Sequence, residues 1–408
     1  MEVIKMKALK IGLEKYLTAK QQKVVDPQYR PEYTEIVELD PEYPEPELIN
    51  DQWVKVKVKL GGICGTDMNL INLKTSTVLS NFSSFPCVPG HEIVGTIEEI
   101  GGNVGDLDIG ERVILDESLG CEVRGLEPCE ACARGEYSLC SNLDKGNLAP
   151  GAITGFCKDT GGAWGEHVIA HRSQIFKIPD SLSWEEALLA EPLACSMHAS
   201  LKRLPKANEN CVVVGCGTIG LLAIASLNAL SEGNILAVAK YPFQAEMAEK
   251  MGADVVQLIK KDRHIKKIGR QLNAKIVSPA MENAYLLGEG ADVVIDSVGN
   301  PSSISDSLHM VKTQGDLVML GYPSYVEIDF TPIMAKEINL TASNIFSYDT
   351  LKGKRRRTLQ IALNMIDEGI IDTKDFLTHN LPLEKYGEAL NIAANKSKFK
   401  AIKIAFKY

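Results

Sequence analysis

The sequence lacks an excess of positive charge. Its 53 acidic residues outnumber its 44 lysines and arginines, which gives a formal net charge of −9. A nucleic-acid binder needs a basic face that neutralises phosphates, so this balance argues against an electrostatic nucleic-acid-binding function. The single basic run, KGKRRR at residues 352–357, is interpreted as the solvated first turn of a helix. A nuclear-import signal or a phosphate contact is the alternative for this run.

No export signal is evident. The first residues, MEVIKMKALKIGLEKYL, contain no apolar core and no small-residue cleavage site. Residues 211–230 form one apolar run of membrane length, but three glycines near its start and Asn228 near its end favour a strand, a glycine turn and a buried helix. We therefore expect a cytoplasmic protein with no membrane partner, in a reducing compartment where disulfides are rare.

The pattern of the chain changes near residue 210. Before it, residues 61–165 combine short β-like runs with frequent glycines, which is typical of an irregular, mostly β domain. After it, short apolar runs alternate with helical segments, which indicates βαβ units and a parallel sheet. A length of 408 residues agrees with two or three domains.

Three further segments carry local expectations. Residues 183–202 are predicted to be helical, with Ser183 as N-cap and Glu186 completing a capping box. Residues 26–51, rich in proline and acid, are expected to form an exposed loop or a strand-edge excursion. Residues 259–290 are an unusually long polar connection, for which we expect helical pieces.

A dinucleotide-binding turn is predicted at residues 215–220, GCGTIG. The pattern G-x-G-x-x-G follows a VVV strand and opens an apolar helix, which is the context that the motif requires. Gly215 makes the tight turn, Gly217 lets the backbone approach a pyrophosphate, and Gly220 lets the helix pack closely on the strand. The helix N-terminus then faces the phosphates. The predicted coenzyme contacts are Gly215, Gly217, Thr218, Ile219, Gly220 and Lys240.

Lys240 bears on the choice of coenzyme. An NAD site places an acid roughly 20 residues after the motif, where it holds the ribose 2′-hydroxyl. Here the second strand candidate, ILAVA, is followed by Lys240. A cation at this point pairs with the 2′-phosphate of NADP, so we favour NADP. In the alternative, Lys240 faces solvent and the coenzyme is NAD or either.

Several stretches contain residue types that bind metal ions. Cys64 lies in GICGTD, the pair His91 and Glu92 lies in PGHEIVG, and Glu191 lies in AEPLA. Thiolate, imidazole and carboxylate are ordinary zinc ligands, although each residue alone is a weak signal. A separate stretch, residues 120–140, holds four of the ten cysteines, and a reducing compartment disfavours disulfides between them. These four are Cys121, Cys129, Cys132 and Cys140.

Taken in their order along the chain, these motifs resemble the zinc-dependent medium-chain alcohol dehydrogenase superfamily. GICGTD, PGHEIVG, the four cysteines, AEPLA, GCGTIG, DSVG and THNLPLEKYGEA span nearly the whole sequence. AEPLA and GTD resemble the polyol, threonine and sugar dehydrogenase branch.

The resemblance implies an α/β fold of two domains. A GroES-like, mostly β catalytic domain is expected over residues 1–193, with a zinc lobe at about residues 118–145. A Rossmann domain with a doubly wound parallel sheet is expected over residues 194–346. Residues 347–408 are then expected to return to the catalytic domain.

The resemblance also implies roles for single residues. Cys64 and His91 would bind a catalytic zinc, and Glu92 and Glu191 would be nearby ligands that alternate with water. Thr66 would match the hydroxyl that passes the substrate proton, and Asp67 would orient the ring of His91. For Thr66 and Asp67, turn capping is the alternative. The four cysteines would form a closed structural zinc site; a three-cysteine site with Cys121 free, or an iron–sulfur or redox role, are the alternatives.

The sequence departs from the family pattern at three points. Asn69 stands where the family often has the outer histidine of the proton relay, and an amide cannot take a proton. Leu126 stands where the first of the four lobe cysteines usually lies, and Cys121 is expected to reach in as that ligand because RGLEP is a flexible insertion. The connection at residues 259–290 is longer than usual.

The implied activity is hydride transfer between a secondary alcohol and NAD(P). The substrate would be a small-molecule alcohol or ketone: a polyol, a sugar or an amino alcohol such as threonine. Two zinc ions per chain, one catalytic and one structural, and NADP or NAD are the implied cofactors, and a homodimer or homotetramer is the implied assembly. The alternatives are a non-catalytic, zinc-stabilised NAD(P) sensor and a zinc-free quinone or enoyl reductase, which lacks both the ligand set and the cysteine lobe.

Overall fold

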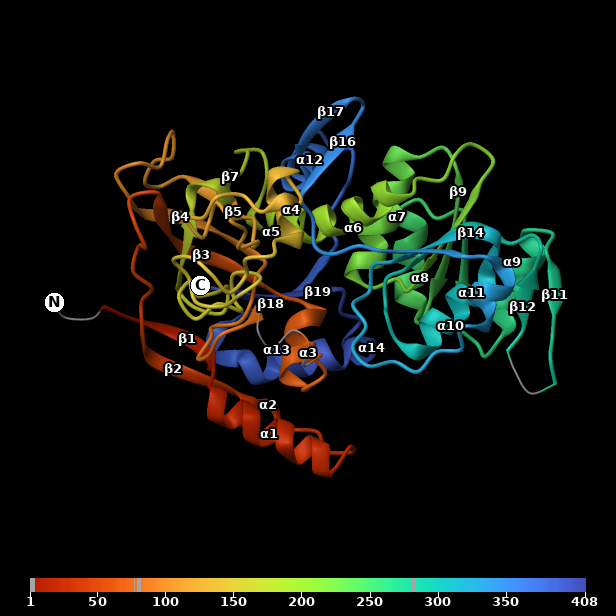
Figure 1. Ribbon diagram of the computed structural model, residues 1–408, viewed down its shortest axis with the longest axis horizontal. Helices are drawn as coiled ribbons and strands as arrows, with labels where there is room; N and C mark the ends of the chain where they lie inside the picture. The colour runs from red at the N-terminus through yellow and green to blue at the C-terminus, as the bar shows by residue number, and fades with distance from the viewer. Residues whose placement is uncertain (1–3, 77, 79–81, 281–282) are drawn as a thin grey trace. The chain divides into compact units, whose positions relative to one another are not determined.

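The computed structural model describes residues 4–76, 78, 82–280 and 283–408 (Figure 1). The chain divides into two compact units. Unit 1 comprises Met1–Glu191 and Asp372–Tyr408, and unit 2 comprises Pro192–Ile371. The compact units divide after Glu191 and Ile371, and the domain borders expected from the sequence, after residues 193 and 346, stay a prediction.

A seven-stranded sheet forms the core of unit 1. Six strands follow the order β18-β19-β3-β4-β5-β7, and β6 pairs with β3. In β3, Lys57 and Lys59 are exposed between buried apolar residues, as the alternation of apolar and charged residues predicts. The strands are β3 (Trp53–Ile63), β4 (Ile93–Ile100), β5 (Arg112–Leu115), β6 (His167–His171), β7 (Ile175–Lys177), β18 (Leu377–Pro382) and β19 (Lys403–Lys407).

Short helices in unit 1 precede or follow these strands. The predicted helix over residues 183–202 is present but is divided at Leu189, and Ser183 and Glu186 form the expected capping box. The helices are α3 (Gly65–Ile71), α4 (Glu130–Ala133), η2 (Tyr137–Leu139), η3 (Arg172–Gln174), α5 (Trp184–Leu188), α6 (Ala190–Lys202), which continues into unit 2, η4 (Leu383–Lys385), α13 (Tyr386–Ala394) and α14 (Lys396–Phe399).

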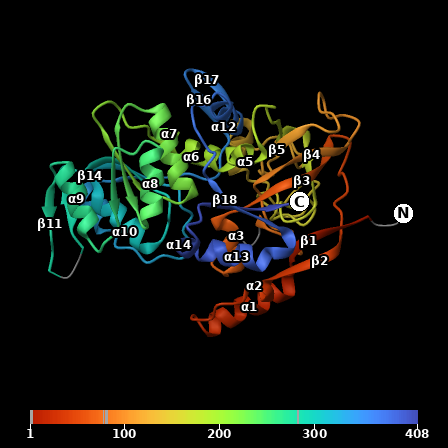
Figure 2. The same ribbon diagram turned by 180° about the vertical axis from the view of Figure 1, so that it is seen from behind.

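The N-terminal segment is more regular than the sequence suggested. β1 (Lys5–Ile11) pairs in antiparallel fashion with β2 (Val37–Pro44), and α1 (Leu13–Val25) and α2 (Tyr33–Ile36) connect them. Both views show the two helices beside this strand pair (Figure 2). The expectation of an exposed loop over residues 26–51 is therefore wrong for the part that forms α2 and β2. Ile36 and Val37 are buried there, and the strand partner lies about 30 residues earlier in the chain, beyond the reach of local sequence signals.

Unit 2 contains a six-stranded, wholly parallel sheet with the order β10-β9-β8-β13-β14-β15. Its first strand, β8, leads through the glycine turn into α7, so the apolar run 211–230 is a strand, a turn and a buried helix, as predicted. This is the expected Rossmann-like arrangement. The strands are β8 (Asn210–Val214), β9 (Asn234–Ala239), β10 (Val255–Leu258), β13 (Ala291–Asp296), β14 (Val311–Met319) and β15 (Asn339–Ala342).

Helices connect the strands of unit 2, and several apolar side chains of α9 and α10 belong to its core. The long polar connection holds α9 and a two-stranded pair of β11 (Lys275–Val277) and β12 (Tyr285–Leu287), in agreement with the expected helical pieces. The helices are α7 (Thr218–Leu230), α8 (Pro242–Lys250), α9 (Arg263–Gln271), α10 (Pro301–Met310), α11 (Thr331–Lys336) and α12 (Thr358–Asp367).

The basic run is a β-hairpin and not a helical turn, which corrects the prediction for residues 352–357. β16 (Tyr348–Leu351) pairs with β17 (Lys354–Arg357), and α12 begins only at Thr358. Asp349 ties the hairpin to unit 2, because its Oδ2 lies 2.8 Å from His198 Nδ1 and accepts a 2.7 Å hydrogen bond from Thr358. Cross-strand pairing and this anchor outweigh the helical preference that the apolar pattern suggested.

The buried helix α7 is apolar but short. Within the described parts of the chain, no helix has the length and apolar character that crossing a membrane requires.

Candidate active site and metal sites

Unit 1 brings Cys64, His91 and Glu92 together. One ligand atom of each residue lies within 4.8 Å of the others. Cys64 is the N-cap of α3, directly after β3, and His91 and Glu92 directly precede β4. Because β3 and β4 are antiparallel neighbours, the end of one strand and the start of the other meet at one edge of the sheet. A thiol, an imidazole and a carboxylate at this spacing fit a zinc ion.

Asp67 holds two of these ligands in place. Its Oδ2 accepts a 2.8 Å hydrogen bond from the backbone N–H of Cys64, which closes the first turn of α3. Its Oδ1 lies 3.4 Å from Nδ1 of His91, so Nε2 is the ring nitrogen left for a metal ion. Asp67 thus caps the turn and also faces His91. Turn capping and orientation of the His91 ring, the two interpretations offered for this residue, are therefore compatible. Thr66 is exposed, and its hydroxyl lies 3.8 Å from Cys64 Sγ.

The same contacts determine the protonation of His91. Burial disfavours its charged form, but the carboxylate of Asp67 and the thiol of Cys64 outweigh burial and raise the pKa of His91 well above its ordinary value. A metal ligand has to be deprotonated, so a metal ion and a proton compete for this ring.

Glu92 forms a buried ion pair with Lys403 of β19. Both side chains are almost inaccessible to solvent, and Lys403 also donates a 3.4 Å hydrogen bond to the carbonyl of Ile63. Burial disfavours the charged lysine, but Glu92 and Cys64 outweigh it and raise the pKa of Lys403. Gly62 is required here, because a Cβ at that position would lie 1.8 Å from Glu92 Oε2.

Glu191 is buried, but it is not a member of the group formed by Cys64, His91 and Glu92. Instead, a carboxylate oxygen of Glu191 lies within 4.8 Å of one from Glu117. Burial raises the pKa of Glu117 well above its ordinary value, and the negative charges of Glu191 and Asp116 raise it further. The positive charge of His91 acts in the opposite direction. The role of Glu191 as a zinc ligand therefore stays a prediction.

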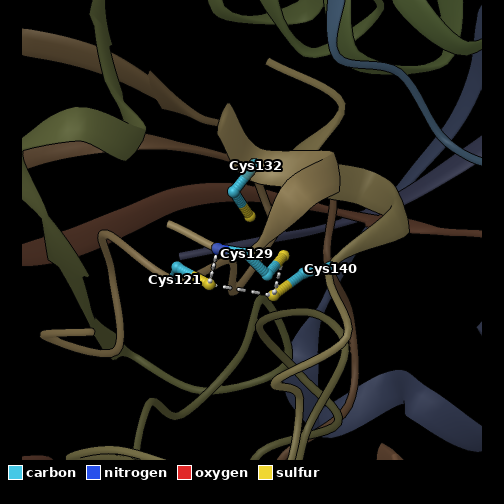
Figure 3. A group of neighbouring side chains, drawn as sticks. All are labelled: Cys121, Cys129, Cys132 and Cys140. Carbon is cyan, nitrogen blue, oxygen red and sulfur yellow. Dashed lines mark hydrogen bonds between the residues drawn. The ribbon is translucent and has the colours of Figure 1, made fainter. Parts of the chain in front are cut away.

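The four predicted lobe cysteines form a second cluster, and their sulfur atoms all lie within 4.8 Å of one another (Figure 3). Cys121 Sγ lies 3.5 Å from Cys140 Sγ, and Cys129 Sγ lies 4.0 Å from the same atom. These separations are too long for disulfide bonds. They match the spacing of four sulfurs at about 2.3 Å from a tetrahedral zinc ion. The structure thus brings Cys121 into the position that Leu126 leaves without a ligand.

Arg124 holds the lobe against the segment that follows it. Its side chain is fully buried and donates hydrogen bonds of 2.6 to 3.2 Å to five backbone carbonyls. These carbonyls belong to Leu119, Lys145, Leu148, Ala149 and Gly151. A guanidinium has five N–H donors in a fixed plane, so this one side chain fixes a loop that has little regular structure of its own.

The glycine turn of unit 2 has the geometry that the motif predicts. Gly215 has φ of +93°, and Gly217 is the N-cap of α7 with open space where its Cβ would be. A Cβ on Gly220 would lie 1.9 Å from the carbonyl oxygen of Gly215. Thr218 is buried and Ile219 half-buried in the first turn of α7, and a helix N-terminus suits a pyrophosphate.

Lys240 directly follows β9 and is exposed, with its ammonium 5.5 Å from the ring centroid of Tyr241. Because β8 and β9 are parallel neighbours, Lys240 and the glycine turn lie at the carboxyl ends of adjacent strands. This is where a doubly wound sheet binds the ribose of a dinucleotide.

Comparisons with known proteins agree with this geometry. Residues 50–180 match the family model of the alcohol dehydrogenase GroES-like domain, and residues 218–364 match that of zinc-binding dehydrogenase. Sorbitol dehydrogenase of Bombyx mori is 30% identical over 362 residues, which cover 88% of this chain and 93% of that protein. L-threonine 3-dehydrogenase of Bacillus subtilis (strain 168) is 30% identical over 363 residues, covering 86% and 90%.

A solved structure, 2R,3R-butanediol dehydrogenase from Bacillus subtilis, shares the fold with a TM-score of 0.72 at 23% identity, over 99% of both chains. The chain belongs to the zinc-dependent medium-chain alcohol dehydrogenase superfamily. It is an enzyme of this superfamily that acts on CH–OH donors with NAD(P), in the polyol and threonine branch.

Three residues of this dehydrogenase were missed by sequence reasoning: Lys403, Glu117 and Arg124. Each is a charged residue that the structure buries almost completely. Lys403 and Glu117 carried a signal, because they interrupt or end apolar runs, AIKIAF and RVILDE. Their partners lie far away in the chain, so the signal named no contact.

The first prediction concerns the Glu92–Lys403 pair. We expect Lys403→Met to lower the free energy of unfolding by roughly 3 to 5 kcal/mol, because it leaves a buried carboxylate without its cation. Adding Glu92→Gln to this variant should recover part of the loss. Urea unfolding of the wild type, both single variants and the double variant measures this. A double variant no more stable than Lys403→Met alone would show that the pair is not coupled.

The second prediction concerns the cysteine lobe. Cys121→Ser should remove one zinc ion per chain, because serine is a poor ligand in a thiolate site. Metal analysis of the purified protein gives the count, and Cys211→Ala, a buried cysteine outside the cluster, is the matched control. Unchanged zinc content in Cys121→Ser would favour the three-cysteine site with Cys121 free.

The third prediction separates the roles of two glycines. Gly220→Ala should weaken coenzyme binding at least about tenfold and also lower the unfolding temperature, because the added methyl collides with the backbone of Gly215. Gly217→Ala should weaken coenzyme binding but keep the stability, because its methyl enters only the space left for phosphates. Calorimetric titration and thermal unfolding measure the two effects. Equal behaviour of the two variants in both experiments would contradict this division.

Proposed function

We propose that the enzyme transfers a hydride between a secondary alcohol with neighbouring polar groups and NAD(P). The substrate classes are polyols, sugars and amino alcohols such as threonine. The observation that supports this most is the group formed by half-buried Cys64 and the buried residues His91 and Glu92. A coenzyme sensor or a zinc-free reductase has no need for such a group, because neither has to bind an alcohol oxygen at a metal ion.

In this proposal each protein group has a distinct task. Zinc, when bound at Cys64 and His91, would act as a Lewis acid and lower the pKa of the alcohol. Asp67 keeps the His91 ring oriented. The hydroxyl of Thr66 would relay the proton of the alcohol: it accepts that proton while it donates its own to a water molecule. The nicotinamide, when bound, would accept the hydride from the carbinol carbon. Asn69 can donate to or accept from a water molecule but cannot take the proton, so water carries it from Thr66 to solvent.

Lys240 supports NADP as the preferred coenzyme, because it is an exposed cation at the carboxyl end of β9, next to the glycine turn. We further infer a reducing, cytoplasmic setting from ten cysteines that form no disulfide. A homodimer or homotetramer, two zinc ions per chain and the domain borders that the resemblance implies are part of the same proposal.

The experiment is a spectrophotometric assay of the zinc-replete protein, with NAD and NADP tested separately. The substrates are polyols, sugars, threonine-like amino alcohols and simple secondary alcohols. We expect reduction of NADP with one of the polar classes, and a loss of roughly tenfold or more in kcat/KM for NADP in Lys240→Asp, since a carboxylate repels the 2′-phosphate. Activity with NAD alone would overturn the proposal that Lys240 binds the 2′-phosphate of NADP. No activity together with a single zinc per chain would favour the sensor.

A further inference from the structure

Glu117 is a buried carboxyl group beside the predicted zinc ligands, and the mechanism above gives it no task. Its residue is 1% exposed, and one of its oxygens lies within 4.8 Å of a carboxylate oxygen of Glu191. Glu191 itself is 3% exposed. Two carboxyl groups at this distance repel each other when both are ionised, and burial adds to the cost. The carboxyl group of Glu117 therefore needs a cation or a proton at this position.

The backbone that carries Glu117 is fixed on both sides. The carbonyl of Glu117 accepts a 2.8 Å hydrogen bond from Thr154 N–H. The side-chain amide of Gln174 donates to the carbonyls of Asp116, at 2.8 Å, and Ser118, at 3.4 Å. In addition, Tyr137 of the cysteine lobe donates a 2.8 Å hydrogen bond to Asp116 Oδ2. These hydrogen bonds hold the backbone of residues 116–118 in place and so restrict the orientation of the Glu117 side chain, as a metal ligand requires.

One oxygen of Glu117, Oε2, is buried without a hydrogen bond to any residue that the structure describes. Glu117 differs in this respect from Glu92, whose buried carboxylate forms an ion pair with Lys403. Buried charged groups are found paired or bound to metal ions, because an unpaired one is costly. The open oxygen and the second carboxyl group together point to a bound cation.

We propose that Glu117 is a further ligand of the catalytic metal ion, which it binds in the position that it shares with Glu191. The inference rests on the proposed zinc-dependent function. It would give the metal ion of this chain the carboxylates of Glu117 and Glu191 as ligands, in addition to the thiol of Cys64 and the imidazole of His91.

The test is Glu117→Gln in the full-length, zinc-replete protein. Glutamine keeps the size of the side chain and mimics a protonated acid, so it removes only the ability to bind a metal ion as an anion. We expect the affinity for the more weakly held of two zinc ions, measured by competition with a chelator, to fall roughly tenfold or more. After replacement of that zinc by cobalt(II), we also expect the visible absorption spectrum to differ from that of the wild type.

Three further variants make the result specific. Glu122→Gln, an exposed glutamate five residues later, is the matched control and should behave as wild type. Glu191→Gln should weaken the same metal site. Glu117→Asp keeps the charge but shortens the side chain, and it should alter the cobalt spectrum even if the glutamine variant does not fold. Retention of the zinc held by the four cysteines shows that a variant has folded.

The inference is overturned if Glu117→Gln, or Glu117→Asp in its place, keeps both the wild-type affinity and the wild-type cobalt spectrum. In that case Glu117 shares a proton with Glu191 and has only a packing role beside the metal site. A wild-type protein with a single zinc, at the cysteine lobe, would overturn the proposed function along with the inference. Two zinc ions in the wild type and an unchanged Glu117→Gln would overturn the inference alone.

Discussion

The buried contact between Glu92 and Lys403 is the constraint on which the catalytic unit depends. A buried carboxylate next to a half-buried thiol and a buried imidazole is stable only with a cation nearby. Lys403 is that cation, and it comes from the last strand of the chain, more than 300 residues after Glu92. Unit 1 therefore has to be built from both ends of the sequence, with β19 paired to β3 directly beside Cys64.

The close packing around Glu92 also explains two glycines nearby. Gly62 has no side chain because Glu92 occupies that space, and its N–H donates a 2.9 Å hydrogen bond to the carbonyl of Glu92. Gly90 has φ of +88° and lies against Trp164, whose ring nitrogen donates to the carbonyl of Gly62. The ligands are thus held by backbone contacts and by large buried side chains, so their geometry does not depend on the metal ion alone. Such support is what a metal site needs for a defined coordination geometry.

The features that could be predicted best from the sequence depend on residues close together in the chain. The glycine turn, the capping box of Ser183 and Glu186, the alternation in β3 and the grouping of cysteines are all short-range patterns with a physical cause, and each has the expected geometry. The fold and the family followed from the order of such patterns. What could not be predicted involves partners far apart in the chain: Lys403 on Glu92, Glu117 beside Glu191, and β1 with β2. The hairpin of β16 and β17 was mistaken for a helical turn because its residues carry no strand alternation and its anchor, His198, lies about 150 residues earlier.

Anomalous diffraction from crystals at the zinc absorption edge tests the central claim most directly, because it locates metal ions without reference to activity. We expect two peaks for each chain. One lies among the sulfur atoms of the four lobe cysteines, and the other lies next to Cys64 and His91, with the ion pair of Glu92 and Lys403 beside it. A single peak at the cysteine lobe, from crystals grown with excess zinc, would show that Cys64 and His91 do not bind a zinc ion.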